Sequence, residues 1–300
     1  MEKFEGQNIL DFMETFPDDD ACKAYLANLK WQDGFKCSKC GHTKGCLRGD
    51  HGYFCYSCHH VESATAGTLF HKVKFGVRKA FCIAFEMATL SKGISSIQIG
   101  KRYGIRQATA WYFMQKVRKA MESSERWPMS GLVHVDEFVI GGHEERKQGR
   151  SYNTNKTKAI VAVEFNEKKN IKRVYAQVID DYSSDSFIPF FKQHISKDAQ
   201  IVTDKWTGYI PLKKDYNITQ IRSSPKKNFE KIHLIIHQIK TWIRTVPVHV
   251  SKHHIRAYFN EYSFRINRSQ FGDSIFHKLI ERMVKQEPLY HSQILQKLNE

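Results

Sequence analysis

The chain lacks any long hydrophobic run, and no stretch approaches the roughly 18 apolar residues of a membrane-spanning helix. Its opening residues, Met1 to Gly6, carry no apolar signal segment. Internal repeats and low-complexity tracts are also absent. These absences predict a soluble, intracellular protein without membrane partners. A length of 300 residues predicts two or three globular domains.

Acidic residues are few compared with basic ones. The chain has 31 Asp and Glu against 47 Lys and Arg, which gives a net charge of +16. Because the surplus extends over the whole length rather than one tail, it favours binding of a polyanion, with DNA or RNA as the leading candidate. Attraction to a membrane surface and simple solubility remain as alternatives.

Seven cysteines is an odd number, and four of them follow a pattern that disulfides do not require. Cys37 and Cys40 form one CxxC pair, and Cys55 and Cys58 form a second. Two such knuckles supply four thiolates for a tetrahedral zinc site, so we predict a zinc ribbon over residues 35–62. A redox CxxC is the alternative. The remaining cysteines are interpreted as buried or incidental thiols: Cys22, Cys46 and Cys82.

Helical spacing dominates the rest of the N-terminal half. Residues 1–34 are predicted to be helical, and further helices are expected at 77–91, 95–103 and 107–123. The last two flank Gly104, which predicts a helix-turn-helix-like DNA-binding region over 75–125. Arg106, Gln107 and Lys116 are its candidate DNA contacts. An ordinary pair of packed helices is the alternative.

After residue 131 the pattern changes to alternating strands and helices. Strands are predicted at 132–140, 159–165, 171–178, 200–203 and near 218–221, with helices at 184–194, about 231–245 and 251–266. This order predicts an α/β domain with a mixed sheet over residues 132–270, followed by a helical tail over 271–300.

Two aspartates interrupt or end these strands. Asp136 lies inside the first strand and Asp204 directly follows the strand at 200–203. An unpaired carboxylate there would lose several kcal/mol to desolvation, so we expect a metal partner. In a ribonuclease-H-like sheet the two would lie side by side and bind Mg²⁺ or Mn²⁺. The alternative is that each aspartate only begins a turn or caps a helix.

Basic residues accompany this predicted site. On the helix that starts at Glu230, one face presents His233, His237, Lys240 and Arg244. The insertion from Gly141 to Lys158 is predicted to contact phosphates, with Arg150 and Lys156 among its cations. In both cases a solvated basic surface is the alternative.

The chain resembles the insertion-sequence transposases of the IS1595 group, with an ISXO2-like catalytic domain. The motifs that carry the resemblance run nearly end to end: Phe16-Pro-Asp-Asp, Leu29-Lys-Trp31 with Gly34, the CxxC ribbon, Val135-Asp-Glu137 with Gly141-Gly142, Gly149-Arg150, Thr203-Asp204 before Trp206 and Gly208-Tyr209, and Tyr258 to Arg268. The last of these is the most specific.

The resemblance implies a catalytic residue set. Such families carry two aspartates and a third residue seven positions before a Lys or Arg, and counting back from Lys240 gives His233. Asp136, Asp204 and His233 would then bind the catalytic ions, while Lys240 contacts a DNA phosphate. Since imidazole is a softer ligand than carboxylate, Mn²⁺ can serve better than Mg²⁺, or His233 can act as an acid or base.

Neighbouring acids receive other roles. Glu230 and Glu261 are the fallback third acids, although Glu261 is expected to form an ion pair with Arg265. Glu137 is expected to point to the opposite face of its strand and to be structural.

The implied function is DNA transposition. The ribbon and helix-turn-helix would bind the terminal inverted repeats of a bacterial insertion sequence, and the C-terminal domain would cleave double-stranded DNA and transfer the strand. A homo-oligomer on DNA, in the cytoplasm at the nucleoid, is expected. The alternatives are a non-catalytic DNA-binding protein, either a regulator or a domesticated transposase, and a ribonuclease-H-like nuclease without strand transfer.

Overall fold

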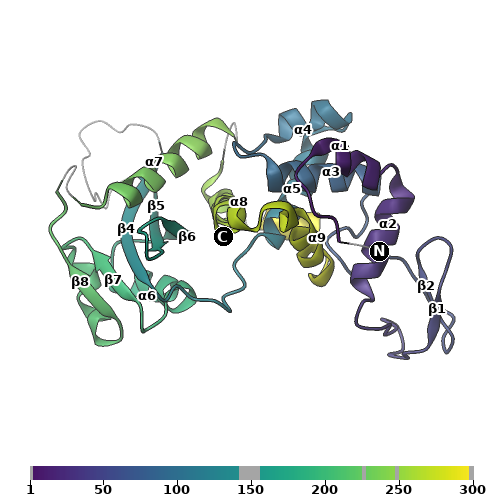
Figure 1. Cartoon of the computed structure of the whole chain (residues 1–300), viewed down its shortest axis with the longest axis horizontal. Coiled ribbons are helices and arrows are strands. Elements are labelled where there is room, and N and C mark those ends of the chain that lie inside the picture. The colour runs from purple at the N-terminus through teal and green to yellow at the C-terminus, as the bar shows by residue number, and fades with distance from the viewer. Residues whose placement is uncertain (1–2, 142–155, 225–227, 247–249, 297–300) are drawn as a thin grey trace. The chain divides into compact units, whose positions relative to one another are not determined.

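The structure is a computed structural model that describes residues 3–141, 156–224, 228–246 and 250–296. Its contacts group the chain into two units (Figure 1). The first unit combines residues 1–121 with residues 268–300, and the second comprises residues 122–267. The five-segment domain division expected from the sequence stays a prediction. None of the described helices is long and apolar enough to cross a membrane.

Helices form most of the first unit. They are α1 (Ile9–Thr15), α2 (Asp19–Lys30), α3 (Val77–Thr89), α4 (Ser96–Tyr103), α5 (Gln107–Ala120), α9 (Ile275–Lys285) and α10 (His291–Gln296). Local sequence sets their ends: a capping box of Ser95 and Gln98 starts α4, and Gly104 ends it at a φ of 60°. This left-handed residue turns the chain into α5, as the helix-turn-helix prediction requires.

A three-stranded antiparallel sheet follows α2. Its strands are β1 (Gly45–Leu47), β2 (Tyr53–Cys55) and β3 (Val61–Glu62), in the order β1-β2-β3. Phe35 stacks on Tyr53 with ring centroids 4.0 Å apart, which gives this small sheet an aromatic core. The two CxxC pairs lie at its knuckles, as expected for a ribbon.

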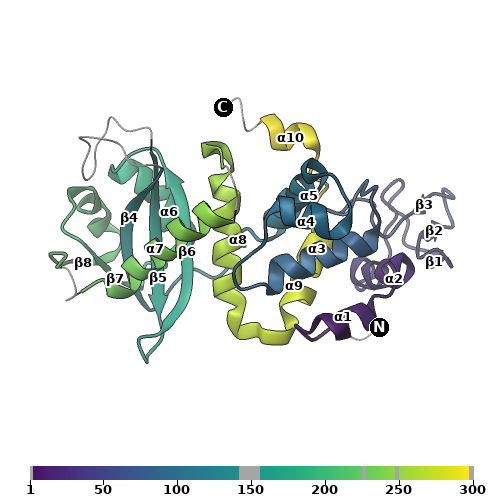
Figure 2. The same cartoon turned by 90° about the horizontal axis from the view of Figure 1, so that it is seen from above.

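Aromatic side chains from both ends of the chain build the core of the first unit. Phe12 stacks on Phe85 of α3 at 4.3 Å and meets Phe276 of α9 edge-on at 5.3 Å. All three are buried. Figure 2 shows α9 beside α3. Residues 275–285 therefore complete the core that α1 and α3 begin, a long-range pairing that local periodicity could not predict.

The second unit contains a five-stranded mixed sheet. Its strands are β4 (Leu132–Ile140), β5 (Thr157–Phe165), β6 (Ile171–Ile179), β7 (Gln200–Thr203) and β8 (Asn217–Gln220). The order is β6-β5-β4-β7-β8 (Figure 2). β4, β5 and β6 pair antiparallel, whereas β7 runs parallel to both β4 and β8. The mixed α/β architecture predicted from the sequence is confirmed.

Helices cover both faces of this sheet. α7 (Glu230–Thr245) and α8 (Ile255–Arg268) pack on one face, where Phe138 joins their core. α6 (Ser184–His194) packs on the other, against Val133 and Val135. Figure 1 shows α7 and α6 on opposite sides of the strands. Since β4 is central and alternates between two cores, a charged residue on it needs a specific partner.

Candidate active site and metal centres

The two predicted aspartates lie next to each other because β4 and β7 are parallel neighbours. The register pairs Leu132 with Gln200 and His134 with Val202. Continuing this register by two residues brings Asp204 level with Asp136. Neighbouring strands lie only about 5 Å apart, so the pairing brings Asp136 and Asp204 close together although they are far apart in the sequence.

Glu137 joins the aspartates in one cluster of carboxylates. A ligand oxygen from each of Asp136, Glu137 and Asp204 lies within 4.8 Å of the others. Strand alternation directs Glu137 towards the α6 side, with Val133 and Val135. Its longer side chain nevertheless brings a carboxylate oxygen to the aspartates. Glu137 therefore lies on the expected face of β4 and still reaches the aspartates, and its structural role stays a prediction.

Hydrogen bonds fix the backbone around both aspartates. Asp136 Oδ1 accepts from the Glu137 amide at 2.9 Å, and Asp204 Oδ1 accepts from the Trp206 amide at 2.9 Å. The side chain of Gln220 on β8 donates to the carbonyls of Asp204 and Trp206, at 3.0 and 2.8 Å. The turn after β7 is thus held in one conformation, which orients the Asp204 carboxylate.

The segment after Asp204 packs tightly under the cluster. Trp206 Nε1 donates to the Tyr182 carbonyl at 2.7 Å. A Cβ on Gly208 would lie 2.5 Å from that same carbonyl oxygen, so this position requires glycine. The close approach buries Tyr209 completely.

The buried hydroxyl of Tyr209 lies near the Glu137 carboxylate. Burial, followed by the negative charge of Glu137, raises the pKa of Tyr209 well above its usual value. The phenol therefore stays protonated and can donate to the Glu137 carboxylate. No role was predicted for Tyr209 from the sequence, although the Gly208-Tyr209 motif was part of the family resemblance.

α7 brings His233 to the edge of the cluster. The His233 Nε2 atom lies 3.3 Å from Asp136 Oδ2, and the His233 side chain is 47% exposed. The hydrogen bond with Asp136 raises the pKa of His233, and partial burial opposes that shift. His233 can therefore act as an imidazolium partner of Asp136 or, once deprotonated, as a nitrogen ligand.

Lys240 lies two helical turns further along α7. Its ammonium is 5.8 Å from the centre of the Phe138 ring. Burial lowers the pKa of Lys240, as does the neighbouring charge of Arg244, and Asp136 opposes both. Lys240 therefore lies near Asp136 but is not a member of the carboxylate cluster. Its ammonium group is in a position suited to an anionic substrate group.

The fallback acids have other surroundings. Glu261 is completely buried within α8, and its Oε1 lies 3.9 Å from Arg265 Nη1, which confirms the predicted i,i+4 ion pair. Glu230 is exposed in the first turn of α7. Neither residue joins the carboxylate cluster among the residues that the structure describes.

The carboxylate cluster suits a hard divalent cation. Its donors are oxygens from three acids, which Mg²⁺ and Mn²⁺ prefer over nitrogen or sulfur ligands. Asp136, Glu137 and Asp204 could hold such an ion, with His233 at the edge. Three acids this close together repel one another unless a cation or protons compensate them, which is an electrostatic reason to expect metal.

The four ribbon cysteines suit zinc. Cys37 Sγ lies 3.6 Å from Cys58 Sγ, and Cys40 Sγ lies 3.6 Å from Cys55 Sγ. Zn–S bonds of about 2.3 Å in a tetrahedron place sulfurs roughly 3.8 Å apart, close to these distances. Hydrogen bonding from the Cys58 amide lowers the pKa of Cys55, whereas burial and the neighbouring cysteines raise the pKa of Cys58, so the spacing of the four sulfurs is what indicates zinc.

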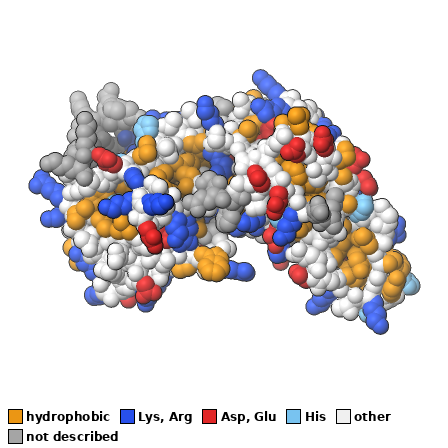
Figure 3. All heavy atoms as spheres, in the orientation of Figure 1, with side chains coloured by type: hydrophobic (Ala, Val, Ile, Leu, Met, Phe, Trp, Pro, Cys, Tyr) orange, Lys and Arg blue, Asp and Glu red, His pale blue; other side chains and the backbone are white. Residues whose placement is uncertain are grey.

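The predicted DNA contacts belong to both units. Arg106 and Gln107 are exposed at the start of α5, where the Gln107 amide donates to Ser96 Oγ at 2.8 Å. Lys116 is half-buried and donates to the His71 carbonyl at 3.0 Å. Lys156 directly precedes β5, and Arg150 lies outside the described residues. Figure 3 shows Lys and Arg side chains spread over both units. DNA binding by these residues stays a prediction.

Together, the sheet and its carboxylates define a candidate divalent-metal centre at the end of β7. Comparisons with known proteins give this arrangement a family context. Residues 128–267 match the family described as the ISXO2-like transposase domain, and residues 17–61 match the transposase zinc-ribbon domain. The resemblance to IS1595-group transposases is thereby confirmed for these segments.

One curated relative comes from a mobile element. It is described as an uncharacterized protein in transposable element ISH50 of Halobacterium salinarum, and it is 24% identical over 147 residues. The alignment covers 46% of this chain and 49% of the relative, so the chain spans about half the length of the curated protein that it matches.

Proposed function

We propose that this protein is a DNA transposase that binds the terminal inverted repeats of an insertion sequence and catalyses metal-dependent cleavage and strand transfer. One observation carries the proposal: Asp136, Glu137 and Asp204 converge within 4.8 Å inside a segment that matches a transposase domain. The strand order, with three antiparallel strands followed by two parallel ones, supports a ribonuclease-H-like catalytic domain.

The residues in and around the cluster would have different roles in catalysis. Asp136, Glu137 and Asp204 would hold Mg²⁺ or Mn²⁺, and such an ion would supply activation of an attacking oxygen and stabilisation of a leaving one. Gln220 and the Trp206 amide orient Asp204, and the protonated Tyr209 hydroxyl would donate to Glu137. His233 would add a nitrogen ligand at the edge of these three carboxylates, or accept a proton beside Asp136.

Cations beside the cluster would bind the DNA backbone. Lys240 and Arg244 follow His233 along α7, and the pKa of Lys240 is lowered by burial and then by the charge of Arg244. Lys156 adds to this positive field. A phosphate placed there would relieve the repulsion, so these groups favour an anionic substrate next to the carboxylates.

The first unit would recognise the DNA ends. Its zinc-ribbon match and the α4–α5 pair supply two elements of kinds that bind DNA, and the net charge of +16 supplies long-range attraction. The proposed partners are double-stranded transposon ends and target DNA, with a second copy of the chain on the same DNA. The proposed location is the cytoplasm, at the nucleoid.

Strand-transfer assays on DNA ends taken from the sequences that flank the reading frame test the catalytic assignment. Asp136→Asn and Asp204→Asn preserve size and remove charge, and we expect each to lower the cleavage rate on the order of a thousandfold with DNA binding retained. Asp198→Asn, at an exposed acid of the same unit, is the matched control and should behave as the native protein. Unchanged cleavage in both cluster variants would refute the assignment.

A non-catalytic DNA-binding protein is the second candidate. The observation that favours it is His233 in the position of the usual third acid, close enough to Asp136 to neutralise it as an imidazolium. Specific binding of the ends without cleavage, in Mg²⁺ and in Mn²⁺, would select this candidate.

A further inference from the structure

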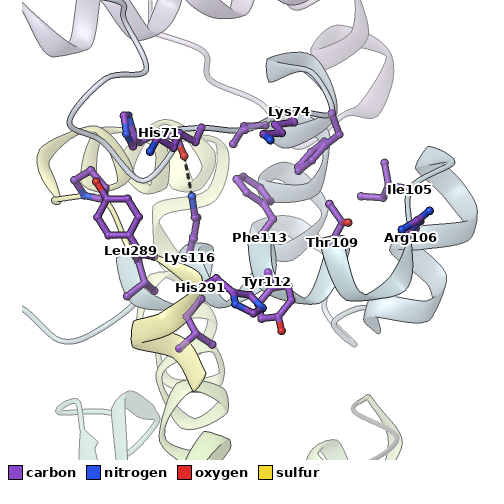
Figure 4. Close-up of a pocket in the computed structure, with 16 residues that line it drawn as sticks. His71, Lys74, Ile105, Arg106, Thr109, Tyr112, Phe113, Lys116, Leu289 and His291 are labelled. Atoms are coloured by element: carbon purple, nitrogen blue, oxygen red, sulfur yellow. Dashed lines mark hydrogen bonds between the residues drawn. The ribbon is translucent and has the colours of Figure 1, made fainter. Parts of the chain in front are cut away.

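A cavity of about 630 Å³ lies beside α5 in the first unit (Figure 4). Its walls come from three segments: residues 71–75, residues 105–116 and residues 288–294. The volume falls inside the range of about 300–1,000 Å³ that small-molecule sites occupy. The cavity belongs to the unit that does not carry the carboxylate cluster, so the proposed chemistry does not account for it.

Aromatic and aliphatic side chains form most of the walls. Phe75 meets Phe113 edge-on at 5.5 Å, and the Tyr112 ring lies 3.9 Å from the ring of His291. Leu289 and Ile294 complete the apolar lining. Figure 4 shows Phe113 directed from α5 towards the segment of His71 and Lys74, and Tyr112 directed towards His291. Such walls suit a flat, apolar-faced group.

Cations surround the apolar walls. Lys72, Lys74, Arg106 and Lys116 all line the cavity, and none of the described residues that line it is acidic. Burial lowers the pKa of His71, and the charges of Lys72 and Lys116 lower it further. Burial also lowers the pKa of Lys116. The site therefore favours a ligand that combines a planar group with negative charge.

The cavity adjoins the proposed DNA-recognition helix. Arg106 is the N-terminal capping residue of α5 and is exposed, and it also lines the cavity. Thr109, one turn later on the same helix, lines the cavity as well. DNA that contacts the start of α5 would thus have its backbone at the cavity's edge.

We propose that this cavity receives one unpaired nucleotide of the DNA bound at α5. The base would lie against the walls that Phe113 and Tyr112 provide, with its phosphates near Lys72, Lys74 and Arg106. The proposal rests on DNA binding by the first unit. Because removing a base from a paired duplex is costly, the site would prefer a base that is already unpaired.

Three matched duplexes test the inference with the full-length, zinc-loaded protein. One is fully paired, one carries a single extra adenine as a bulge, and one carries an abasic nucleotide at that bulge. The abasic duplex keeps the bend and the phosphates but offers no base. Stacking of the base predicts about tenfold tighter binding of the adenine bulge than of the abasic bulge.

Variants then locate the effect. Thr109→Trp and Leu289→Trp fill the cavity from two different walls, and unfolding midpoints show that each variant folds. We expect both to abolish the bulge preference while retaining binding of the paired duplex. Lys101→Ala removes an exposed cation of α4 outside the cavity and should weaken all three duplexes equally.

The outcomes distinguish failure of the nucleotide-binding proposal from failure of DNA binding by the first unit. A bulge preference that is missing in the native protein, or that persists in both tryptophan variants, overturns the inference while leaving duplex binding intact. Binding of deoxyadenosine monophosphate without any bulge preference would identify a site for a free nucleotide and would also overturn it. Failure of the native protein to bind any duplex would instead refute DNA binding by the first unit.

Discussion

The two candidate metal centres of this molecule are built in opposite ways. The ribbon's four thiols come from one short segment, residues 37–58, and two knuckle turns bring them together. The three carboxylates come from two strands that a long stretch of chain separates, and the parallel pairing of β4 with β7 brings them together. The first centre depends on local turns, whereas the second depends on the whole sheet.

This difference predicts different consequences of losing the metal. The ribbon has a core of only a few side chains around Phe35, so we expect its fold to depend on zinc. The carboxylates lie between two large hydrophobic cores that hold the sheet without help. Chelation should therefore unfold the ribbon but leave the second unit folded and inactive.

The largest expected effect is on the ribbon. Cys37→Ser removes one of four thiolates, and we expect loss of about one zinc per chain together with the structure of residues 35–62. Elemental analysis and limited proteolysis measure the two losses. Cys46→Ser, at an exposed cysteine of β1 outside the cluster, is the control and should keep the metal. A metal-free ribbon that resists proteolysis would contradict the comparison.

His233 should have the next largest effect. His233→Ala removes the nitrogen beside Asp136, and we expect cleavage to fall on the order of a hundredfold or more, since one group near developing charge is worth that much. His233→Glu should keep part of the activity with Mg²⁺ because it restores an oxygen ligand. His237→Ala, at an exposed position one turn further along α7, is the control. Full activity of His233→Ala would remove His233 from the site.

The third prediction tests whether Glu137 is a metal ligand or has only a structural role. Glu137→Gln keeps the shape and a hydrogen-bonding partner for Tyr209 but removes the charge, and we expect Mn²⁺ affinity and cleavage to fall about tenfold to a hundredfold. Titration calorimetry measures the affinity, with Glu167→Gln, an exposed acid of the same unit, as control. Native affinity in Glu137→Gln would return Glu137 to the structural role that strand alternation suggests.

The smallest expected effect concerns the scaffold that holds the carboxylates. Burial, together with the charge of Arg256, lowers the pKa of His194 to about 4, where its ring stacks on Tyr175 at 4.3 Å. The unfolded chain, with a histidine pKa of about 6.5, binds the proton first, so stability falls as the pH drops below that value.

We expect His194 to reduce the free energy of unfolding of the second unit by about 1 kcal/mol between pH 7 and pH 5.5. His194→Phe keeps an aromatic ring without a titrating group and should reduce this loss. Denaturant titrations at the two pH values measure it. An equal loss in the native protein and in His194→Phe would exclude His194 as the cause.

The sequence was sufficient where local chemistry determines the structure. β4, β7 and α6 have the predicted bounds, because turn residues and period-2 or period-3.6 patterning act over a few positions. The paired aspartates were also predictable, since each is a charged residue at or inside an apolar strand. The Cys37 and Cys55 pairs needed only their spacing.

The missing parts depend on side-chain length and long-range packing. Alternation assigns Glu137 a face but not the reach of its carboxylate, and Tyr209 enters the site only because Gly208 lets the chain approach Tyr182. The place of Phe276 in the N-terminal core could not be predicted from any local pattern. These contacts depend on three-dimensional packing that a single sequence does not encode in neighbouring residues.

The interrupted first unit has a consequence for synthesis on the ribosome. Phe276 completes the core around Phe12, and residues 288–294 complete the cavity beside α5. Domains generally fold as they emerge, N-terminal ones first, yet this unit must wait for its last helices. The second unit, continuous in the chain, can fold earlier. A growing chain would thus possess its carboxylate centre before its helical unit is complete.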